Sequence, residues 1–391
     1  MIVTSKRLES IDILRGLIIV VMALDHTREY WAVTGFDLTD LHQTTATWFM
    51  MRWVSHFCAP LFVFLTGVSA FLYGQKAPSR GQLQKFMLTR GIWLIFLELV
   101  VVNLSRQFGY QYIFLHIIWA IGISLILLAL MLYLPLWGIL LVNVPFILFH
   151  NAFNDQSMLA LFGGADWLWK IFHVNGVFLL KGTKFPIHVD FPLVPIFSVL
   201  ALGYCAGHLY LQPARLRQRC FIWGGLIMIV IYLFLRLTNL YGDPILFDGS
   251  QHWLLSLLDT TKYPLSLQFL LMTIGPGLIV LALLEKVNLA QNRYLPLRWL
   301  HVFGSVPLFF FILHVPVINA AAQLYTYLVY GRAINFFTEL PGVFPSGYEA
   351  SMMLAFFVWV SLLLVMYLPC KYYGHIKRHS NIKWRRALSY L

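Results

Sequence analysis

The sequence is poor in charged residues, since Asp, Glu, Lys and Arg together make up 11% of its 391 residues. Soluble globular proteins carry about 25%, so an ordinary water-soluble enzyme is excluded. Acidic residues are the scarcer kind, with 16 Asp and Glu against 28 Lys and Arg. The basic residues lie between apolar segments rather than on one water-facing surface. We therefore expect no nucleic-acid partner, despite a formal net charge of +12.

Cysteine is also scarce. The four cysteines are Cys58, Cys205, Cys220 and Cys370, and they are isolated along the chain. Their spacing matches neither a zinc site nor an iron–sulfur site, so no metal and no disulfide framework are expected. The first apolar stretch carries Asp12 and Arg15 instead of ending at a small-residue cleavage site. A cleavable signal peptide is therefore not expected.

Apolar residues are abundant: 60% of the chain is hydrophobic, and the mean hydropathy is +0.74. Crossing about 30 Å of hydrocarbon takes roughly 20 apolar residues. The sequence therefore predicts an all-α, polytopic membrane protein with about ten transmembrane helices. The predicted spans lie near residues 9–31, 46–73, 86–104, 112–133, 135–150, 192–211, 219–241, 266–284, 299–322 and 350–370.

The basic residues predict the orientation of these spans. Most Lys and Arg residues fall in connections that are cytoplasmic if both termini are cytoplasmic, as the positive-inside rule requires. We predict one domain over residues 1–391, because no repeat or low-complexity linker divides it. The aromatic residues of 151–191 favour an interfacial or re-entrant helix. Gly275-Pro276-Gly277 is equally consistent with a cavity-lining break and with a packing kink.

Ionisable residues inside the spans are the candidates for function, because each costs about 2.5–3.5 kcal/mol to insert. Asp12, Arg15 and His26 share one face of the first span at about 100° per residue. Arg15 and His26 lie about 16 Å apart along the helix axis, at 1.5 Å per residue. Under the predicted topology, Arg15 lies in the cytoplasmic half and His26 in the outer half.

Several further polar residues are expected at a similar depth toward the outer face. With His26, they are Arg52, His56, His116, Lys262 and His314. For His56, His116 or His314 alone, a structural role at the membrane interface is as well supported as a function, and Arg52 and Lys262 could be snorkelling cations. Together they predict a shared aqueous chamber.

A histidine in such a chamber can accept and return a proton near neutral pH. An acid such as Asp25 or Asp12 could fix the tautomer of His26, as in a catalytic triad. Arg15 suits a phosphate-bearing ligand, although an ion pair with Asp12 explains it equally well.

The segment from Arg7 to Arg28, RLESIDILRGLIIVVMALDHTR, resembles the opening of the bacterial heparan-alpha-glucosaminide N-acetyltransferase-like membrane proteins. Four further segments resemble that family in the same order: residues 52–72, 188–209, 261–278 and 303–319. The resemblance implies a polytopic helical fold. It also implies transfer of an acetyl group from cytosolic acetyl-CoA to a sugar amine across the membrane.

The spacing of Arg15 and His26 is similar to that in the first helix of acyltransferase type 3 membrane proteins, which O-acylate glycans outside the cell. The lysosomal glucosaminide branch differs here. It has asparagine in place of His26 and a catalytic histidine in the following luminal segment. That histidine would fall at Asp37, and the nearest histidine is His42. Either His26 or His42 could therefore be catalytic, and the helix position shared with Arg15 favours His26.

We therefore expect an acetyl-CoA-dependent O- or N-acyltransferase of the bacterial inner membrane. His26, Asp25 and His42 are the candidate catalytic residues. Donor binding is assigned to Arg15, Arg90 and Lys262, and contacts to the substrate or the oxyanion to Arg52, His56, His116 and His314. Expected partners are membrane lipid, acyl-CoA and a glycan or small sugar acceptor, with a homo-oligomer left open. Direct transfer and an acyl-histidine intermediate both remain open.

Two other functions compete with this prediction. A proton-coupled small-solute transporter would also show intramembrane His, Asp and Arg residues and a helix interrupted by proline and glycine. The lack of a visible duplicated half disfavours it. A membrane scaffold would not need polar residues at a common depth.

Overall fold

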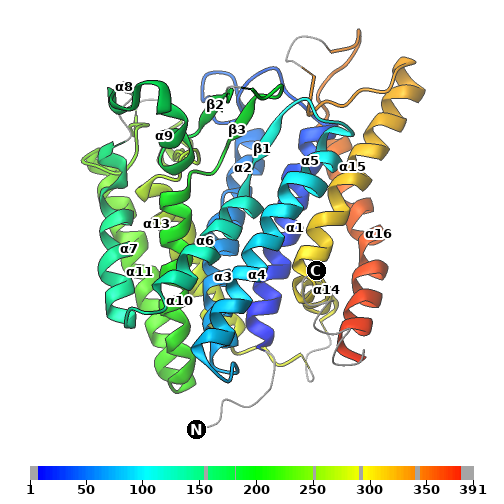
Figure 1. The fold of residues 1–391 in the computed structure, drawn as a ribbon. Helices are drawn as coiled ribbons and strands as arrows, with labels where there is room; N and C mark the ends of the chain where they lie inside the picture. Colours follow the sequence, from blue (N-terminus) through cyan, green and yellow to red (C-terminus); the bar gives the residue numbers. More distant parts are fainter. Residues whose placement is uncertain are drawn as a thin grey trace. The chain divides into compact units, whose positions relative to one another are not determined.

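The protein is mostly helical, as its composition predicts (Figure 1). The computed structural model describes residues 8–153, 157–180, 182–249, 252–289, 294–339 and 344–379. They fold into two compact units. Within the described residues, one comprises 59–100 and 112–283, and the other 8–58, 101–111 and 284–379. The predicted single domain stays a prediction. The cytoplasmic side predicted for both termini concerns residues 1–7 and 380–391, which lie outside the described residues.

The first unit, which we call the α3–α13 unit, contains seven helices of at least 14 residues. These are α3 (Cys58–Gly74), α4 (Arg80–Phe96), α6 (Ile117–Met131), α7 (Leu136–Phe149), α10 (Leu193–Gly207), α11 (Ala214–Thr238) and α13 (Leu267–Leu284). The shorter helices are η2 (His150–Phe153), α8 (Ser157–Phe162), η3 (Gly163–Ala165), α9 (Asp166–Phe172), η4 (His208–Leu211) and α12 (Trp253–Leu258). A π-helical turn, η1 (Leu97–Val102), follows α4.

The Gly275-Pro276-Gly277 segment lies inside α13, which is one helix from Leu267 to Leu284. A Cβ atom at Gly275 would lie 3.0 Å from the carbonyl oxygen of Gly225 on α11, and one at Gly277 would lie 2.2 Å from Leu61 on α3. The missing side chains therefore let three helices approach closely. The segment is a packing feature, and the alternative of a broken helix is wrong.

A small sheet replaces the start of one predicted span. Strands β1 (Ile113–Leu115), β2 (Gly176–Phe178) and β3 (Ile187–Val189) form a sheet in the order β1-β3-β2. β1 pairs with β3 in parallel, and β2 pairs with β3 antiparallel. The span predicted over 112–133 therefore begins only at Ile117, because the preceding residues are extended. The helix predicted within 151–191 is found as the two short helices α8 and α9. Its interfacial or re-entrant position stays a prediction.

Glu98 is buried within this unit and caps a helix. Its carboxylate accepts hydrogen bonds from the backbone N–H groups of Ile118 (2.9 Å) and Trp119 (3.2 Å) in the first turn of α6. These N–H groups have no partner inside the helix, and the negative charge suits the positive end of the helix dipole. A structural role therefore accounts for this intramembrane acid.

The second unit, which we call the α1–α16 unit, has six helices: α1 (Glu9–Trp31), α2 (Ala46–Ser55), α5 (Asn103–Gln107), α14 (Leu295–Ser305), α15 (Pro307–Tyr330) and α16 (Met352–His379). The span predicted over 299–322 is in fact two helices, α14 and α15. They separate at Val306, which has non-helical φ and ψ angles of −136° and 53°. Pro307 is the cause, because a residue before proline is forced away from the helical region.

Helix α1 packs directly on the backbone of α14. A Cβ atom at Gly16 would lie 1.8 Å from the carbonyl oxygen of Leu300, and one at Gly304 would lie 1.7 Å from that of Asp12. Only glycine allows this approach, so both positions exclude every other residue without a backbone shift. Helix α1 also packs against α15 and α16.

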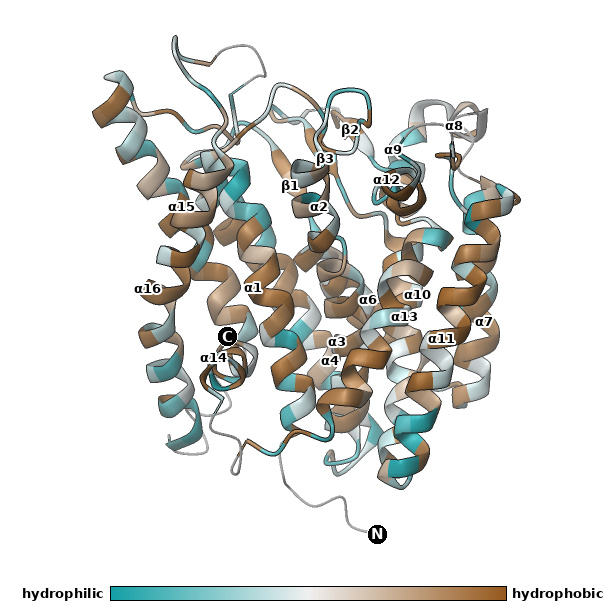
Figure 2. Ribbon diagram, turned by 180° about the vertical axis from the view of Figure 1, so that it is seen from behind, coloured by the Kyte–Doolittle hydropathy of each residue, from teal (hydrophilic) through white to brown (hydrophobic). Residues whose placement is uncertain are grey.

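Eight described segments are long and apolar enough to cross a membrane. Figure 2 shows hydrophobic residues along α7 and α11, as expected for helices that face lipid. Helix α1 is not among the eight; it carries Asp12, Arg15, Asp25 and Arg28. Helix α6, with 15 residues, spans only about 22 Å at 1.5 Å per residue. The chain is therefore a multi-pass membrane protein, and the count of ten stays a prediction.

The contact between α11 and α13 can be tested with two neighbouring glycines. A Cβ atom at Gly225 would lie 2.5 Å from the carbonyl oxygen of Gly275, whereas one at Gly224 would meet nothing within 4 Å. We expect Gly225→Ala to lower the free energy of unfolding by about 1–3 kcal/mol because the backbone cannot yield. Gly224→Ala should leave it unchanged or raise it slightly. Thermal unfolding in detergent measures both, and equal stabilities would contradict the packing.

Candidate active site

Two histidines lie side by side inside the α1–α16 unit. Nδ1 of His26 on α1 is 2.7 Å from Nε2 of His314 on α15. The two rings are nearly parallel, with an angle of 13° between them and 5.0 Å between their centroids. The edge of the Phe311 ring lies beside His26. Both histidines are buried, with 7% of His26 and 0% of His314 exposed. The structure therefore brings together two of the predicted site residues that are 288 positions apart.

The hydrogen bonds of this pair set the position of its protons. Nδ1 of His314 lies 3.0 Å from the carbonyl oxygen of Phe310. A carbonyl oxygen only accepts, so Nδ1 of His314 carries its proton. A neutral His314 then accepts at Nε2, and Nδ1 of His26 must donate to it. The neutral form of His26 therefore has its proton on Nδ1 and its lone pair on Nε2. That is the form in which an imidazole acts as a base or nucleophile through Nε2.

Asp25 contacts arginines. Its Oδ2 accepts a hydrogen bond from Nη1 of Arg52 at 2.6 Å, and its Oδ1 lies 3.3 Å from Arg28. The side chain of Asp25 is 8% exposed and that of Arg52 is 17% exposed. The contact to Nδ1 of His26 is made by His314, which the sequence analysis assigned to the substrate or the oxyanion. The orienting role suggested for Asp25 or Asp12 stays a prediction. Asp25 ties the end of α1 to α2 through Arg52.

A buried arginine that the sequence did not single out lies in the same unit. The backbone carbonyl of Arg106 on α5 accepts hydrogen bonds from Tyr30 Oη (3.1 Å), Asn319 Nδ2 (2.8 Å) and Asn335 Nδ2 (2.9 Å). Its guanidinium lies 3.8 Å from Glu29. These contacts tie α5 to α1 and α15, on which the two histidines lie. Asn319 inside an apolar helix was the available signal, because a buried amide needs a partner.

Arg15 lies near the opposite end of α1 from His26. Its Nη1 is 3.6 Å from Oδ1 of Asp12, and Nε2 of His301 on α14 is 3.8 Å from the other carboxylate oxygen. Asp12 is buried. The predicted ion pair between Arg15 and Asp12 is present. The separation of Arg15 from His26 along one helix is as the sequence predicts.

His42 and His56 differ in burial. His42 is exposed in the connection between α1 and α2. Its backbone N–H donates to Asp40 at 3.0 Å, and this hydrogen bond is the main cause that lowers the pKa of the Asp40 carboxyl. His56 follows α2 and is 1% exposed. The exposed turn around His42 gives its ring no fixed orientation comparable to that of His26.

The remaining predicted residues belong to the α3–α13 unit. His116 precedes α6, and its Nε2 lies 3.7 Å from Asp190. The ammonium of Lys262 lies 5.2 Å from the centroid of the Tyr263 ring. Arg90 is half-buried on α4. Their participation in one chamber with His26 stays a prediction. Within the described residues, no group of three or more His, Cys, Asp or Glu could hold a metal ion.

Comparison with known families adds a functional assignment to this geometry. The family model described as heparan-alpha-glucosaminide N-acetyltransferase, catalytic, matches residues 7–237. The match includes His26, Asp25 and Arg52, whereas His314 lies beyond it. No curated protein matches the chain.

The stability of variants at Asp25 and Arg52 tests whether Arg52 has a structural role besides its predicted role at the oxyanion. We expect Arg52→Gln to lower the free energy of unfolding by about 1–3 kcal/mol, because a buried carboxylate loses its shortest charged partner. The double variant Asp25→Asn/Arg52→Gln should recover much of the loss, since it removes the charge too. Chemical unfolding in detergent measures both. Unchanged stability of Arg52→Gln would contradict the structural role.

Proposed function

The chain belongs to the heparan-alpha-glucosaminide N-acetyltransferase catalytic family, and from that premise we propose a specific reaction for it. It transfers an acetyl or other short acyl group from a cytosolic acyl-CoA to a hydroxyl or amine at the outer side of the membrane. The acceptor is a glycan or small sugar. The membrane is the inner membrane of a bacterium. The family supports acetyl transfer and the apolar helices support a membrane location, while donor, acceptor and sidedness are part of the proposal.

One observation carries the proposal: the chain of hydrogen bonds from Nδ1 of His26 through His314 to the carbonyl oxygen of Phe310. It holds the lone pair of His26 on Nε2 and keeps the ring from rotating. A ring fixed in this way by a neighbour is the arrangement that orients the base of a catalytic triad. A histidine contributes about 10²–10⁴-fold when it transfers a proton in the transition state.

In direct transfer, Nε2 of His26 takes the proton of the acceptor hydroxyl or amine as that atom attacks the thioester carbon. The new bond forms as the carbon–sulfur bond breaks, and Nε2 then returns the proton to the thiolate of CoA. While His26 is charged, its Nδ1–H donates a stronger, charge-assisted hydrogen bond to His314. In the alternative route, Nε2 attacks the thioester itself and forms an acyl-imidazole that the acceptor then cleaves. The same tautomer serves both routes.

Other residues keep proposed roles in binding. Arg52 is a candidate oxyanion donor together with His56 and His116, because a guanidinium is a charged hydrogen-bond donor. Arg15, Arg90 and Lys262 are candidates for the phosphates of the donor. For Arg15 this requires the phosphate to compete with Asp12 or to bind beside it.

The transporter alternative loses one of its supports. The Gly275-Pro276-Gly277 interruption was part of that reading, and α13 is continuous through these residues. The break between α14 and α15 at Val306 is still compatible with a transporter. Glu98, another intramembrane acid, is accounted for as a helix cap. Acyl transfer is therefore the better-supported function.

Substitution of the two candidate histidines, His26 and His42, should affect acyl transfer differently. We expect His26→Ala to reduce acyl transfer from labelled acetyl-CoA by about 10²–10⁴-fold, because the proton acceptor is removed. His42→Ala, at an exposed turn, should stay near the wild-type rate. Purified protein in lipid nanodiscs, with unfolding temperatures as the control for folding, gives both values. Full loss in His42→Ala with activity retained in His26→Ala would contradict the assignment.

The proposed role of His314 is to position the ring of His26, and two substitutions distinguish this role from packing alone. We expect His314→Leu to lower kcat by about 10–100-fold, as for other partners that orient a reacting group. The KM for acyl-CoA should change little, because the role of His314 is exerted through His26. His314→Gln offers an amide oxygen to Nδ1–H of His26 and should recover part of kcat. Equal losses in the two variants would indicate packing alone.

A further inference from the structure

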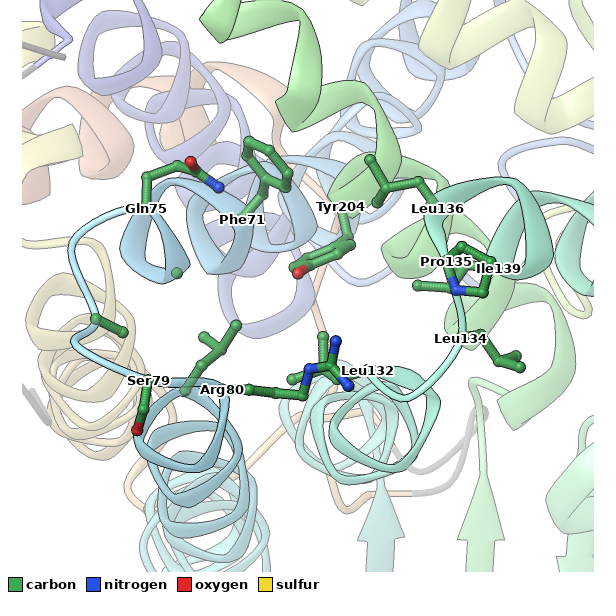
Figure 3. A pocket seen from close by; sticks show the side chains of 13 residues that line it. Phe71, Gln75, Ser79, Arg80, Leu132, Leu134, Pro135, Leu136, Ile139 and Tyr204 are labelled. Atoms are coloured by element: carbon green, nitrogen blue, oxygen red, sulfur yellow. The ribbon is translucent and has the colours of Figure 1, made fainter. Parts of the chain in front are cut away.

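A cavity of about 360 Å³ lies in the α3–α13 unit. It is bordered by the end of α3, the start of α4, the turn between α6 and α7, and Tyr204 on α10 (Figure 3). This volume falls within the range of small-molecule sites. All its walls belong to one compact unit. We propose that this cavity binds a phosphate ester, with Arg80 as the residue that contacts the phosphate.

Arg80 sets the charge of the cavity. It is the one charged residue among the thirteen that line it, and none of these is acidic. Arg80 is exposed at the mouth of the cavity, and its guanidinium carbon lies 5.9 Å from the centroid of the Tyr133 ring. Figure 3 shows the side chain ending beside Leu132, on the same side of the cavity as the hydroxyl of Tyr204. Helix ends of both polarities border the space, so their dipoles oppose one another and Arg80 determines the sign. A guanidinium forms two parallel hydrogen bonds with phosphate oxygens, which makes it a suitable partner for this anion.

The other walls fit the apolar part of such an ester. Phe71, Leu83, Leu132 and Ile139 are buried and line the cavity with carbon. Tyr204 and Phe71 stand edge to face, with ring centroids 5.4 Å apart, and Figure 3 shows both side chains at the same wall. An inorganic phosphate would leave this apolar surface in contact with water. An ester that carries an aromatic or aliphatic group would cover it.

The predicted orientation of the chain in the membrane limits which phosphate esters can reach the cavity. The turn between α3 and α4 carries Lys76, and the start of α4 carries Arg80 and Lys85. The positive-inside rule places such a basic turn at the cytoplasmic face. Two phosphate esters meet a protein there: the nucleotide end of acyl-CoA and the headgroup of an anionic lipid. The first rests on the proposed function, whereas the second does not. Both share a phosphate ester next to an apolar group, which is the chemistry that the cavity fits.

The test uses the full chain in nanodiscs of phosphatidylcholine and adenosine 3′,5′-bisphosphate as the nucleotide probe. We expect Arg80→Gln to weaken binding of the probe about tenfold or more, because a charge-assisted contact is lost. Lys85→Gln is the matched control, because Lys85 is exposed on the same helix, like Arg80, but lies outside the lining, and it should bind as the wild type. A second variant, Leu132→Trp, fills the cavity and should also weaken binding.

A second arm replaces the probe with phosphatidylglycerol and measures retained lipid by native mass spectrometry. Loss of bound lipid in Arg80→Gln but not in Lys85→Gln supports the cavity with a lipid as its source. If neither the nucleotide nor the lipid depends on Arg80, the proposal is overturned. Acyl transfer measured on the same preparations keeps the two proposals apart. If acyl transfer is lost in His26→Ala but binding of nucleotide and lipid does not depend on Arg80, only the cavity proposal fails. If acyl transfer is retained in His26→Ala, only the proposed function fails.

Discussion

The proposed catalytic site depends on one hydrogen bond, the one between Nδ1 of His26 and Nε2 of His314. Its direction follows from the carbonyl of Phe310, which can only accept from His314. Because both rings are buried, water does not compete for these contacts and the tautomers are well defined. The pair therefore gives the chain a histidine with a fixed orientation and an unprotonated Nε2, which is the minimum that acyl transfer requires of a base.

The rest of the α1–α16 unit keeps that hydrogen bond in place. Gly16 and Gly304 allow α1 to lie against the backbone of α14, which fixes one half of α1. Asp25 holds the other end through Arg52. The carbonyl of Arg106 ties α5 to both α1 and α15. A polar network that is satisfied at several points has one arrangement, and this rigidity positions a reacting group better than a loop can.

The sequence predicts the helices well and their partners poorly. Apolar runs locate α7 and α16, because hydrocarbon demands long apolar helices. The runs missed β1, since three extended residues next to an apolar helix have the same composition as the helix. Spacing along α1 found His26, but no local pattern can select His314 as its partner across 288 residues. Asp25 and Asp12 were the acids suggested to orient His26, and consecutive helical side chains such as those of Asp25 and His26 diverge by about 100°.

Nitrogen-15 NMR of histidine-labelled protein in lipid nanodiscs tests the central claim most directly, with His26→Ala and His314→Leu used to assign the signals. We predict that neutral His26 carries its proton on Nδ1 and is coupled by a hydrogen bond to Nε2 of His314. The proton should be free to redistribute between the ring nitrogens of His26 in His314→Leu. A wild-type His26 that carries its proton on Nε2 would contradict the account, because the nitrogen assigned to catalysis would have no lone pair to offer.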